Sequence, residues 1–174
     1  MPNLLQRLIA SGTISRIRRN HALEHATLHI LGSRFPSTTF VGRSDTRGFW
    51  LYGEAATEAV EEAVRQAKAR LSTGEHRLAV HPHCGTTYLT AGVLATAVSL
   101  LSLQAHREED WRARLSRLPF AVLLTVLALI VAQPLGNTLQ QHLTTQPDLA
   151  SLDLVSVRRH SRGRSTVHRV LTSG

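Results

Sequence analysis

Residues 86–105 have the sequence TTYLTAGVLATAVSLLSLQA, and residues 118–135 have the sequence LPFAVLLTVLALIVAQPL. Neither segment contains a charged residue, and each is close to the roughly 20 residues that an α-helix needs to cross a hydrocarbon core of about 30 Å. The intervening stretch, His106–Arg117, is strongly charged, so we place it in water or at the level of lipid head groups. The pattern predicts a transmembrane helical hairpin with spans at about 86–105 and 118–136.

An alternative interpretation is that both segments are buried helices of a soluble protein. The first segment is only moderately apolar, and the second is short for a membrane span. Small residues such as Ala91, Gly92 and Ala95 would suit close packing against a partner helix in either setting.

The sequence on both sides of the hairpin predicts water-soluble α+β structure. Before the hairpin we expect two amphipathic helices, the first of which runs to about Leu31 and stops at Gly32. We also expect two short strands separated by a turn at 44–47, and a further strand at 76–81. After it, residues 152–159 and 165–171 alternate in polarity around a turn and predict a β-hairpin. Because an isolated hairpin is marginal in water, we expect it to join the earlier strands.

The predicted fold class is therefore an α+β soluble domain, with amphipathic helices and a small mostly antiparallel sheet, interrupted by a two-helix transmembrane hairpin. We assign residues 1–85 to the first soluble part, 86–145 to the hairpin and 146–174 to the C-terminal β-hairpin that completes the soluble domain. Both parts of that domain must lie on one side of the bilayer, because the chain crosses it twice.

The charge balance indicates an anionic partner. The chain has 20 Lys and Arg against 12 Asp and Glu, for a net charge of +8. For a chain with an apolar hairpin we expect the lipid bilayer and its anionic head groups to be that partner. We do not expect nucleic acid, since no basic stretch is interleaved with aromatic residues. Assembly as a homo-oligomer or within a larger membrane complex is compatible with the sequence.

The lone Cys84 excludes an intramolecular disulfide. Together with the absence of a continuous apolar core near the N-terminus of this sequence, it favours a reducing compartment. We therefore expect a multi-pass protein of the cell (inner) membrane, with its soluble domain in the cytoplasm.

A histidine pair is the sharpest local feature of the sequence. His21-Ala22-Leu23-Glu24-His25 places two histidines four residues apart, so on a helix their rings lie one above the other and can share a metal ion. At 100° per residue they fall on the same arc as Ile14, Ile17 and Leu28, which directs them toward the core or the membrane surface. Core histidines hydrogen-bonded to the backbone are the alternative.

The pattern H-x-x-E-H also resembles the motif of the inverzincin metallopeptidases. The resemblance covers five residues and implies that His21 and His25 bind zinc while Glu24 is the general base. That family takes a third ligand from a downstream glutamate, and no glutamate of this chain matches its pattern.

A second cluster, His81-Pro82-His83-Cys84-Gly85-Thr86, precedes the first predicted span. Histidine and cysteine are the preferred ligands of Zn²⁺. His21, His25, His81 and Cys84 together would form a closed four-ligand site, and a smaller set would leave a position for water. A tight turn with incidental polar residues is the alternative. We expect His29, His160 and His168 to lie at the surface.

The chain as a whole resembles an uncharacterised family of small bacterial two-span membrane proteins, a domain of unknown function. The resemblance is carried by the segments HALEHATLHIL (21–31), GRSD followed by RGF (42–49) and HPHCGT (81–86). It implies a soluble domain with a membrane hairpin and brings no known activity with it.

Three functional interpretations remain open. The first is a membrane-anchored zinc-dependent hydrolase, such as a peptidase, with Glu24 activating a metal-bound water. The second is a non-catalytic membrane protein, a small subunit or assembly factor, with a structural site for zinc or another divalent metal. In the third there is no metal, and the histidines serve packing or proton-linked roles.

Overall fold

The computed structural model of the protein describes residues 11–104, 115–162 and 165–174. The chain divides into two compact units, one formed by residues 1–81 and 141–174 and the other by residues 82–140. Most of the predicted charged loop at 106–117 lies outside the described residues.

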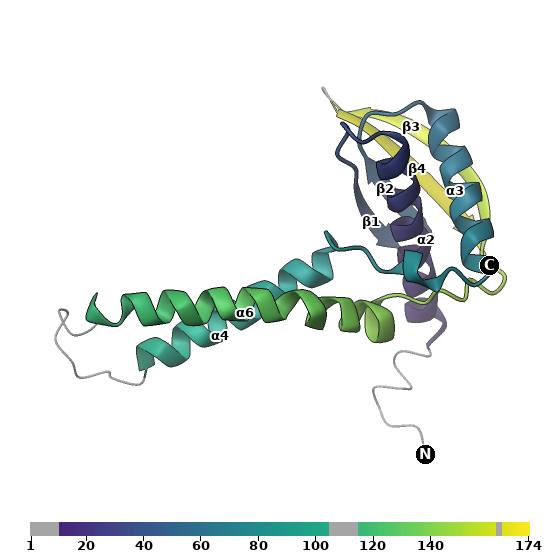
Figure 1. The fold of residues 1–174 in the computed structure, drawn as a ribbon. Helices are drawn as coiled ribbons and strands as arrows, with labels where there is room; N and C mark the ends of the chain where they lie inside the picture. Colours follow the sequence, from purple (N-terminus) through teal and green to yellow (C-terminus); the bar gives the residue numbers. More distant parts are fainter. Residues whose placement is uncertain (1–10, 105–114, 163–164) are drawn as a thin grey trace, which may run out of the picture. The chain divides into compact units, whose positions relative to one another are not determined.

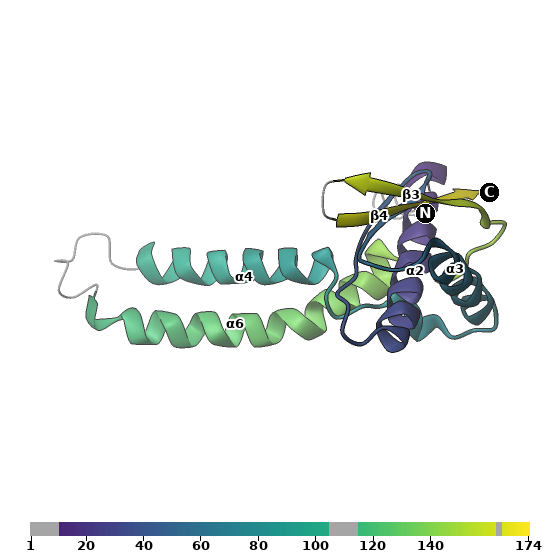
Figure 2. The same ribbon diagram turned by 90° about the horizontal axis from the view of Figure 1, so that it is seen from above.

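The first unit is a layer of two helices on a four-stranded sheet. Both helices lie on the same face of the sheet, as two perpendicular views show (Figures 1 and 2). Its elements are α2 (Gly12–Arg34), β1 (Val41–Asp45), β2 (Gly48–Tyr52), α3 (Thr57–Ser72), the short 3-10 helix η1 (His76–Ala79), β3 (Asp153–Arg162) and β4 (Ser165–Ser173).

The sheet has the strand order β1-β2-β4-β3, and all neighbouring strands are antiparallel. The C-terminal hairpin β3–β4 thus shares a sheet with β1 and β2, and Phe49 of β2 pairs with Val170 of β4. Phe49, Leu51 and Val170 are fully buried against the helices, because alternate residues of a strand point to opposite faces. The predicted α+β class and antiparallel sheet are confirmed.

Helix α2 is the central helix of the first unit and is held to the sheet by a buried asparagine. The side chain of Asn20 is fully buried; it donates a 2.8 Å hydrogen bond to the carbonyl of Asp45 in β1. It also accepts a 2.8 Å hydrogen bond from the hydroxyl of Thr172 in β4. One side chain thereby ties α2 to two strands that are not neighbours in the sheet.

Two local predictions are wrong. Residues 76–79 form η1 rather than a strand. Leu78 and Ala79 are adjacent and both buried, which the alternating faces of a strand do not allow but a tight helical turn does. The first helix also continues through Gly32 to Arg34, since glycine weakens a helix without having to end it.

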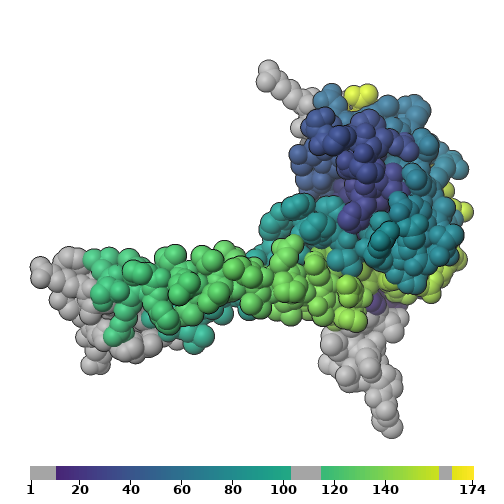
Figure 3. All heavy atoms as spheres, in the orientation of Figure 1, coloured from purple at the N-terminus to yellow at the C-terminus, as the bar shows by residue number. Residues whose placement is uncertain are grey.

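The second unit is a helical hairpin of α4 (Gly85–Gln104) and α6 (Leu118–Leu139). The π-helical turn η2 (Gln140–Thr144) follows α6 and belongs to the first unit from Gln141 on. The two helices approach closely at Gly136, where an added Cβ would lie 2.8 Å from the Cα of Thr87. The buried side chain of Gln140 donates a 2.8 Å hydrogen bond to the Thr87 hydroxyl at the same end. In Figure 3 the green spheres of α6 lie on the surface along the length of the hairpin.

The structure predicts that Asn20→Ala lowers the free energy of unfolding by about 1–3 kcal/mol. The substitution leaves the Asp45 carbonyl and the Thr172 hydroxyl buried without this partner. Loss of a hydrogen-bond partner from a buried polar group costs about 1–3 kcal/mol of stability. Urea unfolding of the purified protein, followed by circular dichroism, would measure the change. Ser72→Ala, at an exposed position of α3, is the control, and equal stabilities of the two variants would contradict the prediction.

Candidate metal centre

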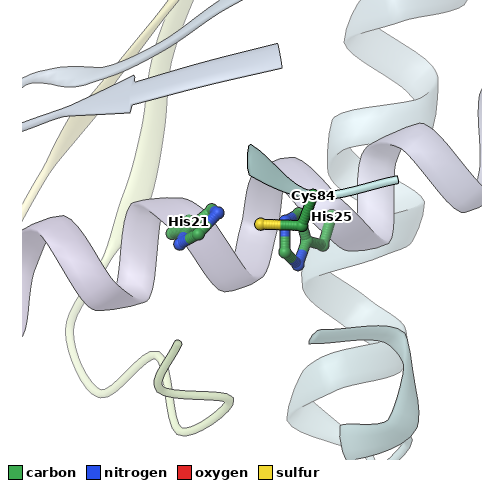
Figure 4. Close-up of side chains that lie close together, drawn as sticks. All are labelled: His21, His25 and Cys84. Carbon is green, nitrogen blue, oxygen red and sulfur yellow. The ribbon is translucent and has the colours of Figure 1, made fainter. Parts of the chain in front are cut away.

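Three histidines follow one another at four-residue intervals on α2: His21, His25 and His29. The ring centroids of His21 and His25 lie 4.2 Å apart in an edge-to-face arrangement. Figure 4 shows these two side chains on successive turns of the helix, on the same side of it. A ring nitrogen of each lies within 4.8 Å of one from the other. Two ligands of one tetrahedral zinc ion are about 3.3 Å apart, so small side-chain rotations would suffice for shared coordination.

Backbone carbonyls orient both rings. Nδ1 of His21 lies 2.9 Å from the carbonyl oxygen of Thr144, and Nδ1 of His25 lies 2.7 Å from that of Ala79. A carbonyl can only accept, so each Nδ1 carries a proton and donates it to the carbonyl. Histidines that bind metals characteristically donate their other ring N–H to a carbonyl or carboxylate in this way.

Burial keeps His25 neutral. Its side chain is only 1% exposed. Burial, and next the neighbouring His21, hold the pKa of His25 well below its usual value, although the hydrogen bond to Ala79 opposes the shift. A neutral imidazole is the form that binds a metal ion.

His81 belongs to the same cluster, and so does His29, which the sequence analysis placed at the surface. The ring of His81 lies 5.8 Å from that of His25 and 4.8 Å from that of His29. Nε2 of His29 is 2.8 Å from the carbonyl oxygen of Val80, and its side chain is half-buried. The i, i+4, i+8 spacing of His21, His25 and His29 in the sequence could have predicted that His29 belongs to the cluster.

Glu24 lies where α2 meets β1. Its side chain is only 3% exposed, and its carboxylate accepts a hydrogen bond from the Ser44 hydroxyl. Gly42 leaves the room that this carboxylate occupies, because an added Cβ there would overlap it. The structure thus shows a hydrogen bond between Glu24 and the sheet. The role of Glu24 as a general base stays a prediction.

Cys84, also labelled in Figure 4, precedes α4 and belongs to the second unit. Its Sγ accepts a 3.4 Å hydrogen bond from the backbone N–H of Thr86. The assignment of His21, His25, His81 and Cys84 as a ligand set remains a prediction.

His168 corrects another expectation, because it is fully buried rather than at the surface. It lies on β4, an inner strand, and alternates with Val170 on the face that the helices cover. Burial, and next the charge of Arg159, lower the pKa of His168.

The shift at His25 predicts that the metal-free protein loses stability as the pH falls below about 6.5. An unfolded chain binds a proton at His25 near pH 6.5, whereas the native state resists protonation there, so acid favours unfolding. His168 acts in the same direction. Removing one such group should reduce the slope of the free energy of unfolding against pH by up to about 1.4 kcal/mol per pH unit.

The measurement is urea unfolding of chelator-treated wild type and His25→Gln between neutral and mildly acidic pH. His160→Gln, at an exposed position, serves as the control and should keep the slope of the wild type. If His25→Gln also kept that slope, the lowered pKa of His25 would be refuted.

Comparison with known proteins places the chain in a family. An uncharacterized protein from Picosynechococcus sp. (strain ATCC 27264 / PCC 7002 / PR-6) is 35% identical over 143 residues, which cover 74% of this chain and 65% of the relative. The chain thus spans just under two thirds of that relative's length. No solved structure matches the chain significantly. Residues 16–157 match the family model described as a domain of unknown function, DUF6391, and the chain belongs to this family.

Proposed function

We propose that this protein is a membrane-anchored metal-binding protein whose α2 histidines hold a divalent transition metal, with zinc as the first candidate. The observation that carries the proposal is the pair of hydrogen bonds from His21 Nδ1 and His25 Nδ1 to backbone carbonyls. They orient both rings through Nδ1 on one face of a helix, as histidines that bind metals characteristically are oriented.

A third ligand can come from Cys84. It follows His81 by three residues, and His81 contacts the ring of His25. Three residues span at most about 10 Å, so the chain allows Cys84 no greater separation than this from His81. Imidazole with thiolate suits zinc, so His21, His25 and Cys84 together would be a suitable donor set for this ion. His81 would close the site as a fourth ligand, whereas a water in its place would leave the site open.

We favour a binding role over hydrolysis because of Glu24. A general base must be available to the metal-bound water, whereas the Glu24 carboxylate accepts a hydrogen bond from Ser44 and lies against Gly42 of β1. Hydrolysis remains the second candidate on the strength of the H-x-x-E-H spacing.

The membrane anchor rests on α4 and α6. Both helices are long and apolar enough to cross a membrane, with mean hydropathies of 1.2 over Gly85–Ser102 and 2.3 over the most apolar 18-residue window within Leu118–Thr144. At 1.5 Å per residue, the 20 residues of α4 span about 30 Å, the thickness of a hydrocarbon core. Large side chains along α6 are about half exposed or more, among them Phe120, Leu123, Ile130 and Val131. An apolar surface of this extent marks a site of contact with lipid or protein.

The metal centre predicts that the purified wild type contains a stoichiometric transition metal and that His21→Ala does not. Loss of an outer-shell partner alone costs 10–100-fold in metal affinity, so loss of a ligand should cost more than about 100-fold. Elemental analysis after gel filtration, and competition with a chromogenic zinc chelator, would measure content and affinity. Cys84→Ser should weaken binding in the same direction.

His76→Ala, which removes an exposed histidine of η1, is the matched control and should retain the metal. Full metal content in His21→Ala would refute the site. Glu24→Gln separates the two candidates: metal retained with loss of a measurable hydrolytic turnover would establish catalysis, and the absence of turnover in the metal-loaded wild type would support binding alone.

The anchor predicts that the protein stays in the membrane pellet after alkaline carbonate extraction. A double variant Leu123→Arg/Leu127→Arg should shift it toward the supernatant, because an arginine at the centre of a span costs about 3 kcal/mol. Val155→Arg, at an exposed apolar position of β3, is the control and should remain in the pellet. Complete extraction of the wild type would contradict the anchor.

A further inference from the structure

The face of the sheet opposite the helices carries a row of four side chains, one from each strand. Arg43 of β1 pairs with Trp50 of β2, Trp50 pairs with Arg169 of β4, and Arg169 pairs with Arg158 of β3. Directly opposed residues share a face, and neighbouring strands lie about 4.8 Å apart, so the row crosses roughly 14 Å of sheet. We call it the Arg–Trp row.

The row is held in place by contacts at its centre. The Arg169 guanidinium lies 4.9 Å from the centre of the Trp50 ring. Two of its nitrogens each lie 2.8 Å from a carboxylate oxygen of Asp45. Although burial alone would raise the pKa of Asp45, the hydrogen bond from Arg169 and further contacts lower it, so the carboxylate stays charged. Arg43 and Arg158, at the two ends, are exposed.

The charge of the row indicates an anionic partner. Like charges directly opposite one another destabilise a sheet, yet Arg158 and Arg169 occupy such a pair. Asp45 offsets one of the three guanidinium charges, and an anionic surface would offset the other two. Next to the row, Val41 is 56% exposed and Tyr52 is 39% exposed, and these two residues also pair across β1 and β2. Arginines beside exposed tyrosine and aliphatic side chains are typical of a surface that meets lipid head groups.

We propose that the Arg–Trp row docks the sheet onto the anionic phosphate head groups of a lipid bilayer. The proposal rests on the membrane anchor proposed above, which supplies the lipid at high effective concentration. His81 of the first unit is four residues from the start of α4, and four residues span at most about 14 Å. Gln141 follows the end of α6 by two residues. The first unit is therefore tethered to the hairpin by two short connections, and tethering favours a second contact with the same surface.

Single-stranded nucleic acid is the competing partner, because it too combines phosphates with groups that stack on tryptophan. The contacts of Trp50 argue against it. Arg169 lies over the indole, and the ring of His160 lies 5.5 Å from it in an edge-to-face arrangement. These two neighbours occupy space that a stacked base would need.

Fluorescence of Trp50 in the full-length protein tests the proposal. Trp111→Phe leaves Trp50 as the one tryptophan, since the chain has two. The protein is reconstituted into vesicles of phosphatidylcholine alone or with phosphatidylglycerol, and acrylamide quenching is measured. We expect weaker quenching with phosphatidylglycerol, and its return to the level in phosphatidylcholine near 1 M salt, where the Debye length is about 3 Å.

Arg43→Ala/Arg158→Ala should remove the protection. A basic residue near an anionic surface changes the docked-to-undocked ratio roughly fivefold, so the pair should lower it about 25-fold. Arg65→Ala/Arg77→Ala removes the same charge from exposed positions outside the sheet and should keep the protection.

Equal quenching of Trp50 in both lipids would overturn the docking proposal. Protection by a single-stranded oligonucleotide in phosphatidylcholine vesicles, without protection by phosphatidylglycerol, would overturn it in favour of nucleic acid. Carbonate resistance of the same vesicles is measured in parallel: a resistant protein with an unprotected Trp50 refutes the docking alone, whereas an extractable protein refutes the anchor.

Discussion

The position of helix α2 along and about its own axis is the constraint on which the first unit depends. Three of its side chains make specific polar contacts in different directions within six residues: Asn20 to β1 and β4, Glu24 to Ser44 of β1, and His25 to the carbonyl of Ala79. A shift of the helix by one residue would rotate each side chain by 100° and separate all three from these partners. The polar contacts therefore select one register for a helix whose apolar residues alone would tolerate several.

The same constraint explains how histidines are accommodated in a core. An imidazole has two nitrogens, and burial of both without partners would be costly. In His21 and His25, Nδ1 donates a hydrogen bond to a backbone carbonyl, which removes part of that cost and orients the ring. The carbonyls come from η1 and η2, which are irregular turns whose carbonyls are not all used by a repeating ladder. The short helical turns that interrupt the regular architecture are thus the parts that orient the site.

Periodicity in the sequence was sufficient for the elements that bury one face. The amphipathic pattern of α3 and the alternation in β3 and β4 are local properties, and the C-terminal hairpin lies beside β2 as the weakness of an isolated hairpin led us to expect. The pattern failed at residues 76–79, where a strand was predicted, because alternation over six residues does not distinguish a strand from a turn that buries Leu78 and Ala79 together.

The candidate site was less accessible from the sequence. The helical spacing of His21 and His25 predicted their proximity, since that is a property of one helix. Other contacts of the site join residues more than 50 positions apart, and no local pattern encodes them. They are the contact of His29 with His81 and the hydrogen bonds of His21 and His25 to backbone carbonyls. His168 was misplaced because its burial depends on which strand is interior, and that is a property of the whole sheet.

Polar residues lower the mean hydropathy of α4, but they are less unfavourable in hydrocarbon than this value indicates. A hydropathy scale assigns each hydroxyl an unfavourable free energy of transfer from water, as though the group had no hydrogen-bond partner in lipid. In α4 the hydroxyls of Thr90, Ser99 and Ser102 each donate a 2.8 Å hydrogen bond to the carbonyl four residues earlier, and Thr125 does the same in α6. The helix itself therefore satisfies these donors, and such a segment can lie in hydrocarbon with little penalty. Thr87 serves a different purpose, since its hydroxyl accepts from Gln140 and its backbone lies against Gly136, so the polar group at this end joins the two helices.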